Sequence, residues 1–261
     1  MAQLWEAIQT NFVVFLLVTI RVSCIFTFNP IFARNGVPAL VKTGGSLLLA
    51  VVMTAAGGFE YTMPDGLLPF AADCVKELLI GAVLGFFVNI TLQVFSMAGE
   101  VADMQIGLSM AKGYDPTFGS AGLTTQLYSL WFMLYFFAVD GHLSYIQLFK
   151  LSYDTIPLGF ETLDINFTYI IVQYFQIVLT LGLKLAMPIV AASLITEFCI
   201  GVLMKAVPTI HVFVLNIQIK MLVGLVVLAA SCGVVSEFMG ELMSLLFTNL
   251  NGLVEQMAIS G

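Results

Sequence analysis

The sequence predicts an all-α membrane protein, and two observations lead to this prediction. Of its 261 residues, 60% are hydrophobic and 10% are charged, whereas a soluble domain is typically about 45–50% apolar and about 25% charged. Three runs contain no charged residue and are long enough, at about 1.5 Å per residue, to cross a hydrocarbon core of roughly 30 Å. These runs are residues 78–99, 116–139 and 165–183.

Shorter apolar runs accompany these three. Residues 7–33 contain one charged side chain, Arg21, and residues 43–59 contain none. Three further runs cover residues 185–196, 206–219 and 221–236. We therefore expect five to seven apolar helices. Residues 1–11 hold no Lys or Arg and so lack the basic region of a cleavable signal peptide, which predicts that the first segment stays as an anchor.

Two local patterns indicate how these helices pack. Gly81 and Gly85 form a GxxxG pattern, which lets two helix backbones approach closely but also arises by chance in glycine-rich apolar helices. In the connection 140–164, Ile146, Phe149 and Tyr153 recur at near-helical spacing. This spacing predicts an amphipathic helix that lies in the membrane interface and ends near Pro157.

The last segment carries a stripe of polar residues at steps of four and three, which is typical of one edge of a helix. We call this the polar stripe: Glu237, Glu241, Ser244, Thr248, Asn251 and Glu255. The stripe would face either a water-filled lumen or a polar partner helix. The alternative is a helix on the membrane surface, but such helices usually carry Lys and Arg on their polar face, and this one has neither.

The chain contains no soluble linker or low-complexity tail, so we expect a single domain over residues 1–261. The connection 29–42 carries Arg34 and Lys42 without an acidic residue, which favours a cytoplasmic position for it and an external N-terminus. The net charge is −7 and no polybasic patch is present. Nucleic acid is therefore not an expected partner.

Signatures of catalysis do not occur in this sequence. The two histidines, His142 and His211, belong to no HExxH motif, and the sequence has no GxSxG elbow and no phosphate-binding glycine loop. The four cysteines are far apart and form no CxxC pair. We therefore expect no enzyme activity, no metal and no cofactor.

Several ionisable residues lie in or beside apolar runs: Arg21, Glu77, Glu100, Asp103, Lys184, Glu197 and Lys220. A charge at the centre of a bilayer costs roughly 2.5–3.5 kcal/mol on insertion scales, so such residues usually face a partner, a bundle interior or water. Pairing within the bundle, a transport pathway and a subunit interface all satisfy this requirement.

Residues 98–116 interrupt the longest apolar part of the chain. Gly99, Gly107 and Gly113 weaken a helix, and Asp115 precedes Pro116, which disfavours helical backbone. We expect a helix through Gln105 and then an irregular loop. Irregular backbone at membrane depth requires surrounding protein or a water-filled cavity. A soft, reversible seal that uses Leu108 and Met110 and a plain turn between two spans both fit this pattern.

The order of characteristic residues, here called marks, along residues 15–225 resembles that of the FliR family of flagellar export-gate proteins. Relatives of this family serve injectisomes. The marks are Arg21, Asn29 to Phe32, Val37-Pro38, Lys42, Glu77, Gly81, Gly85, Phe95, Ala98-Gly99, Asp103, Gln105, Gly107, Asp115-Pro116, Gly141-His142, Ser152, Pro157, Gly159, Ala186, Pro188, Glu197, Gly201, Lys205, Pro208, Phe213 and Lys220. The sequence departs from the family pattern at Thr209 and His211, where the family commonly has Gln and Asn, and at Lys205, where Arg is usual.

The resemblance implies a subunit of the membrane-embedded export gate at the flagellar basal body in the bacterial inner membrane. It implies FliP, FliQ and FlhB homologues as partners and a FliP-like part fused to a FliQ-like part. Tilted helical hairpins would then join a helical pore complex that passes unfolded flagellar substrates. It also implies subunit contacts or buried charges at Arg21, Glu77, Glu100, Asp103, Glu197, Lys205 and Lys220.

The family carries a plug loop that occupies the pore at rest. The matching positions are Gln105, Ile106, Gly107, Leu108, Ser109, Met110, Ala111, Lys112, Gly113 and Tyr114. The alternative function is that of a stand-alone secondary transporter of a small solute or ion, which also uses interrupted helices and buried charges. A lipid-embedded scaffold without a conduit is a third possibility. No inverted internal repeat supports the transporter.

Overall fold

The structure is a computed structural model. It describes residues 2–29, 38–59, 61–64, 66–110, 121–160, 167–206 and 212–258.

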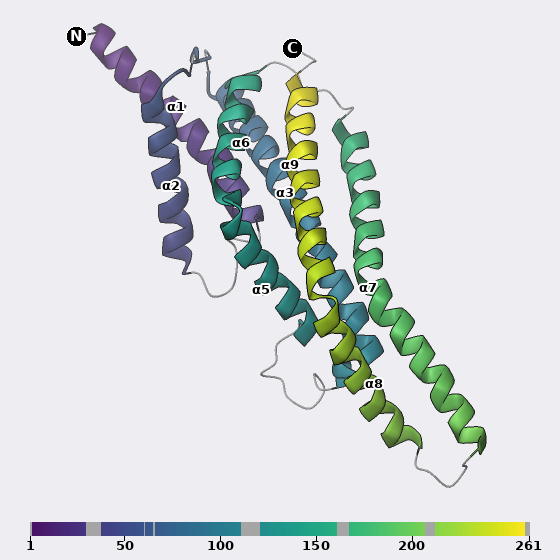
Figure 1. Cartoon of the computed structure of the whole chain (residues 1–261). Helices are drawn as coiled ribbons and strands as arrows, with labels where there is room; N and C mark the ends of the chain where they lie inside the picture. Colours follow the sequence, from purple (N-terminus) through teal and green to yellow (C-terminus); the bar gives the residue numbers. More distant parts are fainter. Residues whose placement is uncertain are drawn as a thin grey trace. The chain divides into compact units, whose positions relative to one another are not determined.

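The prediction of an all-α fold is confirmed, because the described residues form helices and contain no strand. Long apolar helices dominate the chain (Figure 1). The elements are α1 (Ala2–Phe28), α2 (Ala39–Ala56), α3 (Leu67–Ile106), the 3₁₀ turn η1 (Leu108–Met110), α5 (Leu123–Ala138), α6 (Gly141–Thr155), α7 (Phe167–Ala206), α8 (Val212–Ala230) and α9 (Cys232–Ala258).

Four helices in the described part of the chain are long and apolar enough to cross a membrane, and a fifth crossing is counted if α8 and α9 form one span bent by 57° at their junction. The four segments are Asn11–Phe28, Ala39–Ala56, Leu67–Ile106 and Thr168–Ala206. The expected span at 116–139 is not among them, and its residues 116–120 lie outside the described residues. Helix α5 begins only at Leu123 and has 16 residues, which at 1.5 Å per residue is about 24 Å and shorter than a bilayer core.

The described chain divides into two compact units, which we call unit 1 and unit 2. Unit 1 holds residues 1–91, 140–174 and 245–261, and unit 2 holds residues 92–139 and 175–244. Helices α3, α7 and α9 each contribute residues to both units. The single domain expected from the sequence stays a prediction.

Unit 1 has its core between α1, α2 and α6. Buried residues of this core are Val13, Val14, Leu17, Val18, Val22, Ala50, Tyr61, Tyr153 and Leu158. Helix α1 crosses α3 at the two glycines of the GxxxG pattern. A Cβ atom built on Gly81 would lie 2.5 Å from the carbonyl oxygen of Arg21, and one on Gly85 would lie 2.6 Å from the Cβ of Phe28. The prediction of a close helix contact at this pattern is confirmed.

Helix α6 forms where the sequence predicts an amphipathic helix, but Ile146, Phe149 and Tyr153 do not share one buried face. Tyr145, Phe149 and Tyr153 are buried, whereas Ile146 is exposed. The buried face follows steps of four from Tyr145, so Ile146 falls one residue outside it. The helix ends at Thr155, and Pro157 restricts the backbone of the residue before it.

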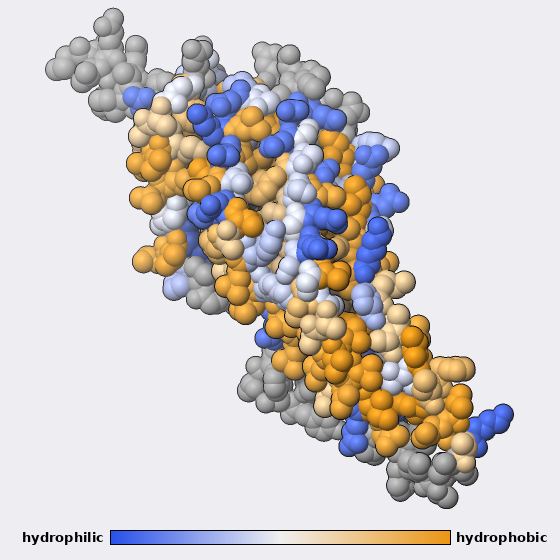
Figure 2. All heavy atoms as spheres, in the orientation of Figure 1, coloured by the Kyte–Doolittle hydropathy of each residue, from blue (hydrophilic) through white to orange (hydrophobic). Residues whose placement is uncertain are grey.

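Unit 2 joins the second part of α3 to α5, α7 and α8. Gly99 lets α3 and α5 touch, since a Cβ atom built on it would lie 2.5 Å from the backbone nitrogen of Thr125. Farther along α3, Ala102 and Ile106 pack with Ile189 of α7 in a small buried cluster. Figure 2 shows mainly hydrophobic side chains over α8 and hydrophilic ones gathered along α9.

Candidate functional site

Arg21 and Glu77 form a buried ion pair between α1 and α3 in unit 1. Both side chains are 0% exposed. The Nε of Arg21 donates to Oε2 of Glu77 at 2.5 Å, and Nη2 donates to Oε1 at 2.9 Å. This is a two-point contact between a planar guanidinium and a carboxylate, the geometry in which arginine binds acids most strongly.

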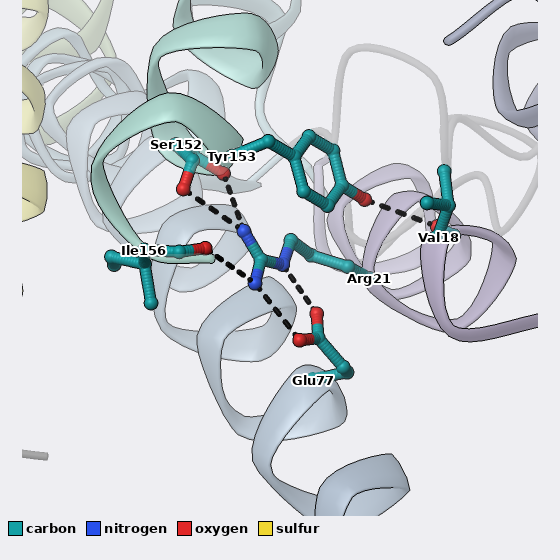
Figure 3. Close-up of polar contacts among 6 residues, drawn as sticks. All are labelled: Val18, Arg21, Glu77, Ser152, Tyr153 and Ile156. Carbon is teal, nitrogen blue, oxygen red and sulfur yellow. Dashed lines mark hydrogen bonds and ion pairs between the residues drawn. The ribbon is translucent and has the colours of Figure 1, made fainter. Parts of the chain in front are cut away.

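The remaining donors of Arg21 reach the last turn of α6. Nη1 donates to the backbone oxygen of Ser152 at 3.0 Å and to its Oγ at 3.1 Å, and Nη2 donates to the backbone oxygen of Ile156 at 3.2 Å. Figure 3 shows the guanidinium enclosed by these groups. Carbonyl oxygens at a helix C-terminus lack intrahelical partners, so a cation is favourable there.

The ring of Tyr153 covers the remaining side of the Arg21 guanidinium. Its ring centroid lies 4.2 Å from the Cζ of Arg21, and its hydroxyl donates to the backbone oxygen of Val18 at 3.2 Å (Figure 3). All five N–H groups of the guanidinium therefore have acceptors. A cluster that is this completely satisfied has no donor left for a ligand, and its physical effect is to tie α1, α3 and α6 together.

A second polar cluster of unit 1 was not predicted from the sequence. Asp73 accepts hydrogen bonds from the hydroxyl of Tyr61 and from the ammonium of Lys76, both at 3.0 Å, and Lys76 also donates to the backbone oxygen of Phe160 at 2.7 Å. Burial, together with the hydrogen bond to Asp73, raises the pKa of the Tyr61 phenol. The signal in the sequence is the acid-rich stretch 60–77, which contains Glu60, Asp65, Asp73 and Glu77.

The structure places the predicted interruption at the end of α3. Gly107 has φ of +89°, a backbone conformation that glycine adopts without strain, and its N–H bonds the carbonyl of Asp103. The expectation of a helix through Gln105 is confirmed to within one residue. Leu108–Met110 form a 3₁₀ turn where irregular backbone was expected. Residues 111–114 of the plug positions lie outside the described residues.

Asp103 connects the two sides of this interruption. The residue is 1% exposed, and Oδ1 accepts the N–H of Thr124 at 3.1 Å and its hydroxyl at 2.6 Å. Thr124 is in the first turn of α5, where backbone N–H groups have no helical partner, so Asp103 caps α5 from another helix. The Oδ2 atom is buried without a hydrogen-bond partner among the described residues.

Gln105 fixes the same end of α3 to α7. The hydroxyl of Ser193 lies 3.2 Å from the backbone oxygen of Gln105 and 3.1 Å from its Oε1. Thr124 and Ser193 were missed by the sequence analysis. Ser and Thr are common in apolar helices, and Thr124 and Ser193 lie far in the sequence from Asp103 and Gln105, their hydrogen-bond partners.

The other predicted contact residues lie mainly at the surface. The ammonium of Lys220 on α8 hydrogen-bonds Oε1 of Glu197 on α7. Glu100, Lys184 and Lys205 are exposed in this chain. The structure thus brings Arg21 to Glu77 and Lys220 to Glu197, and it leaves Glu100 and Lys205 turned outward.

All six residues of the polar stripe are exposed on α9. The opposite side of the helix is buried through Val235, Met239, Leu242, Met243, Leu246, Leu250, Leu253, Val254 and Met257. The stripe continues through both units, so one narrow polar edge follows most of the helix. In the described part of the chain, no group of three or more His, Cys, Asp or Glu residues is arranged to hold a metal ion.

Comparison with known proteins gives one family. Its model, described as "Bacterial export proteins, family 1", matches residues 12–246.

Three similar proteins each match more than four fifths of this chain. The chain is 26% identical over 246 residues to "Flagellar biosynthetic protein FliR" of Escherichia coli (strain K12), with 92% of each chain covered. It is 26% identical over 257 residues to the protein of the same name from Bacillus subtilis (strain 168), with 95% of this chain and 97% of the relative covered. For that from Aquifex aeolicus (strain VF5), the identity is 22% over 221 residues, with 84% and 85% covered.

Proposed function

The chain belongs to the FliR family of bacterial export proteins, and on this basis we propose that it is a subunit of the gate through which unfolded flagellar substrates cross the membrane. Family membership makes it a component of the flagellar export apparatus and a multi-pass protein of the bacterial inner membrane. We assign it no catalytic step and no cofactor.

The observation that carries this proposal is the end of the 40-residue helix α3 at Gly107. The bond between Asp103 and Thr124 holds the chain on both sides of residues 107–122. This arrangement supports a role as plug for residues 105–114.

The residues that begin the plug suit a reversible seal. Leu108 packs against the buried cluster of Ala102, Ile106 and Ile189 without being fully buried itself. Met110 adds a flexible thioether, which adapts to different neighbours. Such a seal excludes ions by packing, and it yields when an unfolded chain enters.

Partner subunits are the second part of the proposal. FliP, FliQ and FlhB homologues would cover the apolar side chains that α7 and α8 expose, among them Ile195, Phe198, Val202, Leu222 and Val226. Glu100 and Lys205 would pair with charges of those subunits, because both are exposed here and a lone charge at membrane depth requires a partner or water. The polar stripe of α9 would line the wet side of the conduit.

The test is co-expression of this chain with candidate FliP and FliQ homologues, with an affinity tag on this chain alone. Native mass spectrometry of the detergent-purified product is expected to give one large hetero-oligomer that contains all three proteins. Charge-removing substitutions of Glu100 and Lys205 are expected to reduce recovery of FliP and FliQ, and Lys76→Gln, which removes a charge held inside this chain, is the matched control.

The alternative is a stand-alone secondary transporter of a small solute or ion. It is favoured by the same buried charges and by the interrupted helix. Recovery of a stable solitary chain, or of a small homo-oligomer, would contradict the gate and support the transporter.

A further inference from the structure

A cavity lies within unit 1 where helices α2 and α6 end. Its volume is about 470 Å³, and small-molecule sites usually measure roughly 300–1,000 Å³. The lining comes from the end of α2 and the loop after it, within residues 53–59, and from the end of α6 and the loop after it, within residues 150–158. The clusters around Arg21 and Asp103 do not use this space, so its chemistry is considered separately.

Two opposite charges of α6 line this cavity. They are the side chains of Lys150 and Asp154, and both residues are exposed. Among the described residues, neither side chain takes part in an ion pair or a hydrogen bond. A basic residue four positions before an acidic one is the less favourable order for pairing within a helix. An ammonium and a carboxylate are therefore available to a ligand, one helical turn apart.

Asp154 lies where a helix favours a positive charge. It is in the last turn of α6, which ends at Thr155 and has no basic residue in that turn. The carbonyl end of a helix attracts a cation and repels an anion. A ligand cation beside Asp154 is thus stabilised both by the carboxylate and by the helix end. The anionic group of the same ligand then lies nearer to Lys150, one turn earlier.

Apolar and aromatic side chains form most of the remaining lining. Phe59 and Tyr153 meet edge to face with their ring centroids 5.2 Å apart, and Met53 lines the cavity with them. A further aromatic ring is attracted to such rings in an offset or edge-to-face arrangement. A Cβ atom built on Gly57 or Gly58 would meet nothing within 4 Å, so the glycine stretch of the lining leaves open space.

We propose that this cavity binds a free amino acid with an aromatic side chain. The carboxylate of the ligand pairs with Lys150, its ammonium pairs with Asp154, and its ring lies against Phe59 and Tyr153. A ligand with a single charge would leave one of the two α6 side chains unpaired. Tyr153 also covers the guanidinium of Arg21 (Figure 3), so the ligand contacts the cluster that ties α1, α3 and α6 together. The inference is independent of the export function.

The test titrates the full-length chain in detergent micelles with L-phenylalanine, followed by saturation-transfer NMR of the ligand. Lys150→Gln and Asp154→Asn are each expected to weaken binding by about two- to fivefold, the usual effect of losing one exposed ion pair. Lys184→Gln removes one positive charge from unit 2; it is the matched control for Lys150→Gln and leaves binding unchanged. Empty micelles correct for ligand that partitions into detergent.

Three related ligands separate the parts of this recognition. Phenethylamine lacks the carboxylate, 3-phenylpropionate lacks the ammonium and glycine lacks the ring, so each is expected to bind more weakly than L-phenylalanine. Lys150→Gln is expected not to weaken binding of phenethylamine, and Asp154→Asn is expected not to weaken binding of 3-phenylpropionate, because each of these ligands lacks the group that the substituted residue pairs with.

Two results would overturn the proposal. One is equal binding of L-phenylalanine by Lys150→Gln, Asp154→Asn and Lys184→Gln, which would show that the two charges bind no ligand. The other is binding of phenethylamine as tight as that of L-phenylalanine, which would replace the amino acid with a simple cation. If one of the two charge variants does not fold, the other decides.

Discussion

Arg21 shows at the residue scale how this chain tolerates a charge inside an apolar helix. Its guanidinium meets an acid on α3 and two carbonyl oxygens at the end of α6, so no N–H group is left unpaired. Transferring both charges from water is costly, and only such full pairing offsets that cost. The pair is therefore sensitive to the loss of one partner.

Replacing Arg21 alone with Met is expected to destabilise the chain by about 3–5 kcal/mol, because Glu77 is left as an uncompensated buried charge. The double variant Arg21→Met, Glu77→Met is expected to recover much of this loss. Thermal unfolding in detergent checks both. Lys76→Met is the matched control and should cost less, since Lys76 is partly exposed. A double variant no more stable than the single one would show that charge pairing is not the reason.

Gly107 has a backbone conformation that favours glycine. With φ of +89°, Gly107→Ala is expected to destabilise the chain by about 1–2 kcal/mol, since other L-residues avoid this conformation. Gly201→Ala is the control, because Gly201 is inside α7 and a Cβ atom there would meet nothing within 4 Å. Alanine at that position is expected to stabilise the helix by about 0.5–1 kcal/mol. Equal melting temperatures for the two variants would contradict the assignment.

At the scale of elements, two faces of helix α9 lie in different environments. Its polar stripe is exposed while the opposite side is buried. Exposure alone does not distinguish water from lipid, but a cysteine thiolate forms and reacts only where water reaches it. Chemical labelling can therefore assign the environment of the stripe.

Single cysteines at Ser244 and Asn251 are expected to react with a water-soluble methanethiosulfonate reagent in the assembled complex. Cysteines at Leu246 and Leu250 are expected not to react, because these positions are buried within the chain. The background carries replacements of Cys24, Cys74, Cys199 and Cys232. Unreactive cysteines at both stripe positions would contradict a water-filled lumen and favour lipid or a dry partner helix.

At the scale of the whole molecule, the exposed apolar surface indicates that other components cover this chain. Large hydrophobic side chains are exposed on α2, α7 and α8, and exposed apolar patches of this kind mark membrane or subunit contacts. In our proposal a single chain encloses no conduit. The plug therefore closes a pore only in the assembled complex.

Deleting residues 107–112 is expected to increase ion conductance of the purified complex in a planar bilayer, because the segment that fills the pore is removed. Deleting residues 161–164, a connection elsewhere in the sequence, is the control and should leave conductance at the wild-type level. Unchanged conductance after the plug deletion, with FliP and FliQ still bound, would contradict the assignment.

Much of the fold was predictable because apolar length and glycine positions act locally. Charge-free runs identified the cores of α3 and α7, the GxxxG pattern identified a close helix contact without its partner, and the polar spacing identified the edge of α9. Helix α5 is shorter than the charge-free run 116–139 that predicted a span, and Ile146 of α6 does not share the buried face of Phe149 and Tyr153. Hydropathy does not show at which residue a helix begins. An apolar side chain that contacts a neighbouring helix also has the same hydropathy as one that contacts lipid.

The sequence by itself determined that the chain is an apolar α-helical protein interrupted near Gly107, because composition, hydrophobic length and backbone preference are properties of short segments. Only the tertiary structure decided which polar groups meet. Arg21 pairs with Glu77 and the end of α6, Asp103 caps α5, and Asp73 joins Tyr61 to Lys76. Each of these contacts depends on how distant helices cross, and in an apolar interior the cost of an unpaired polar group then selects the partner.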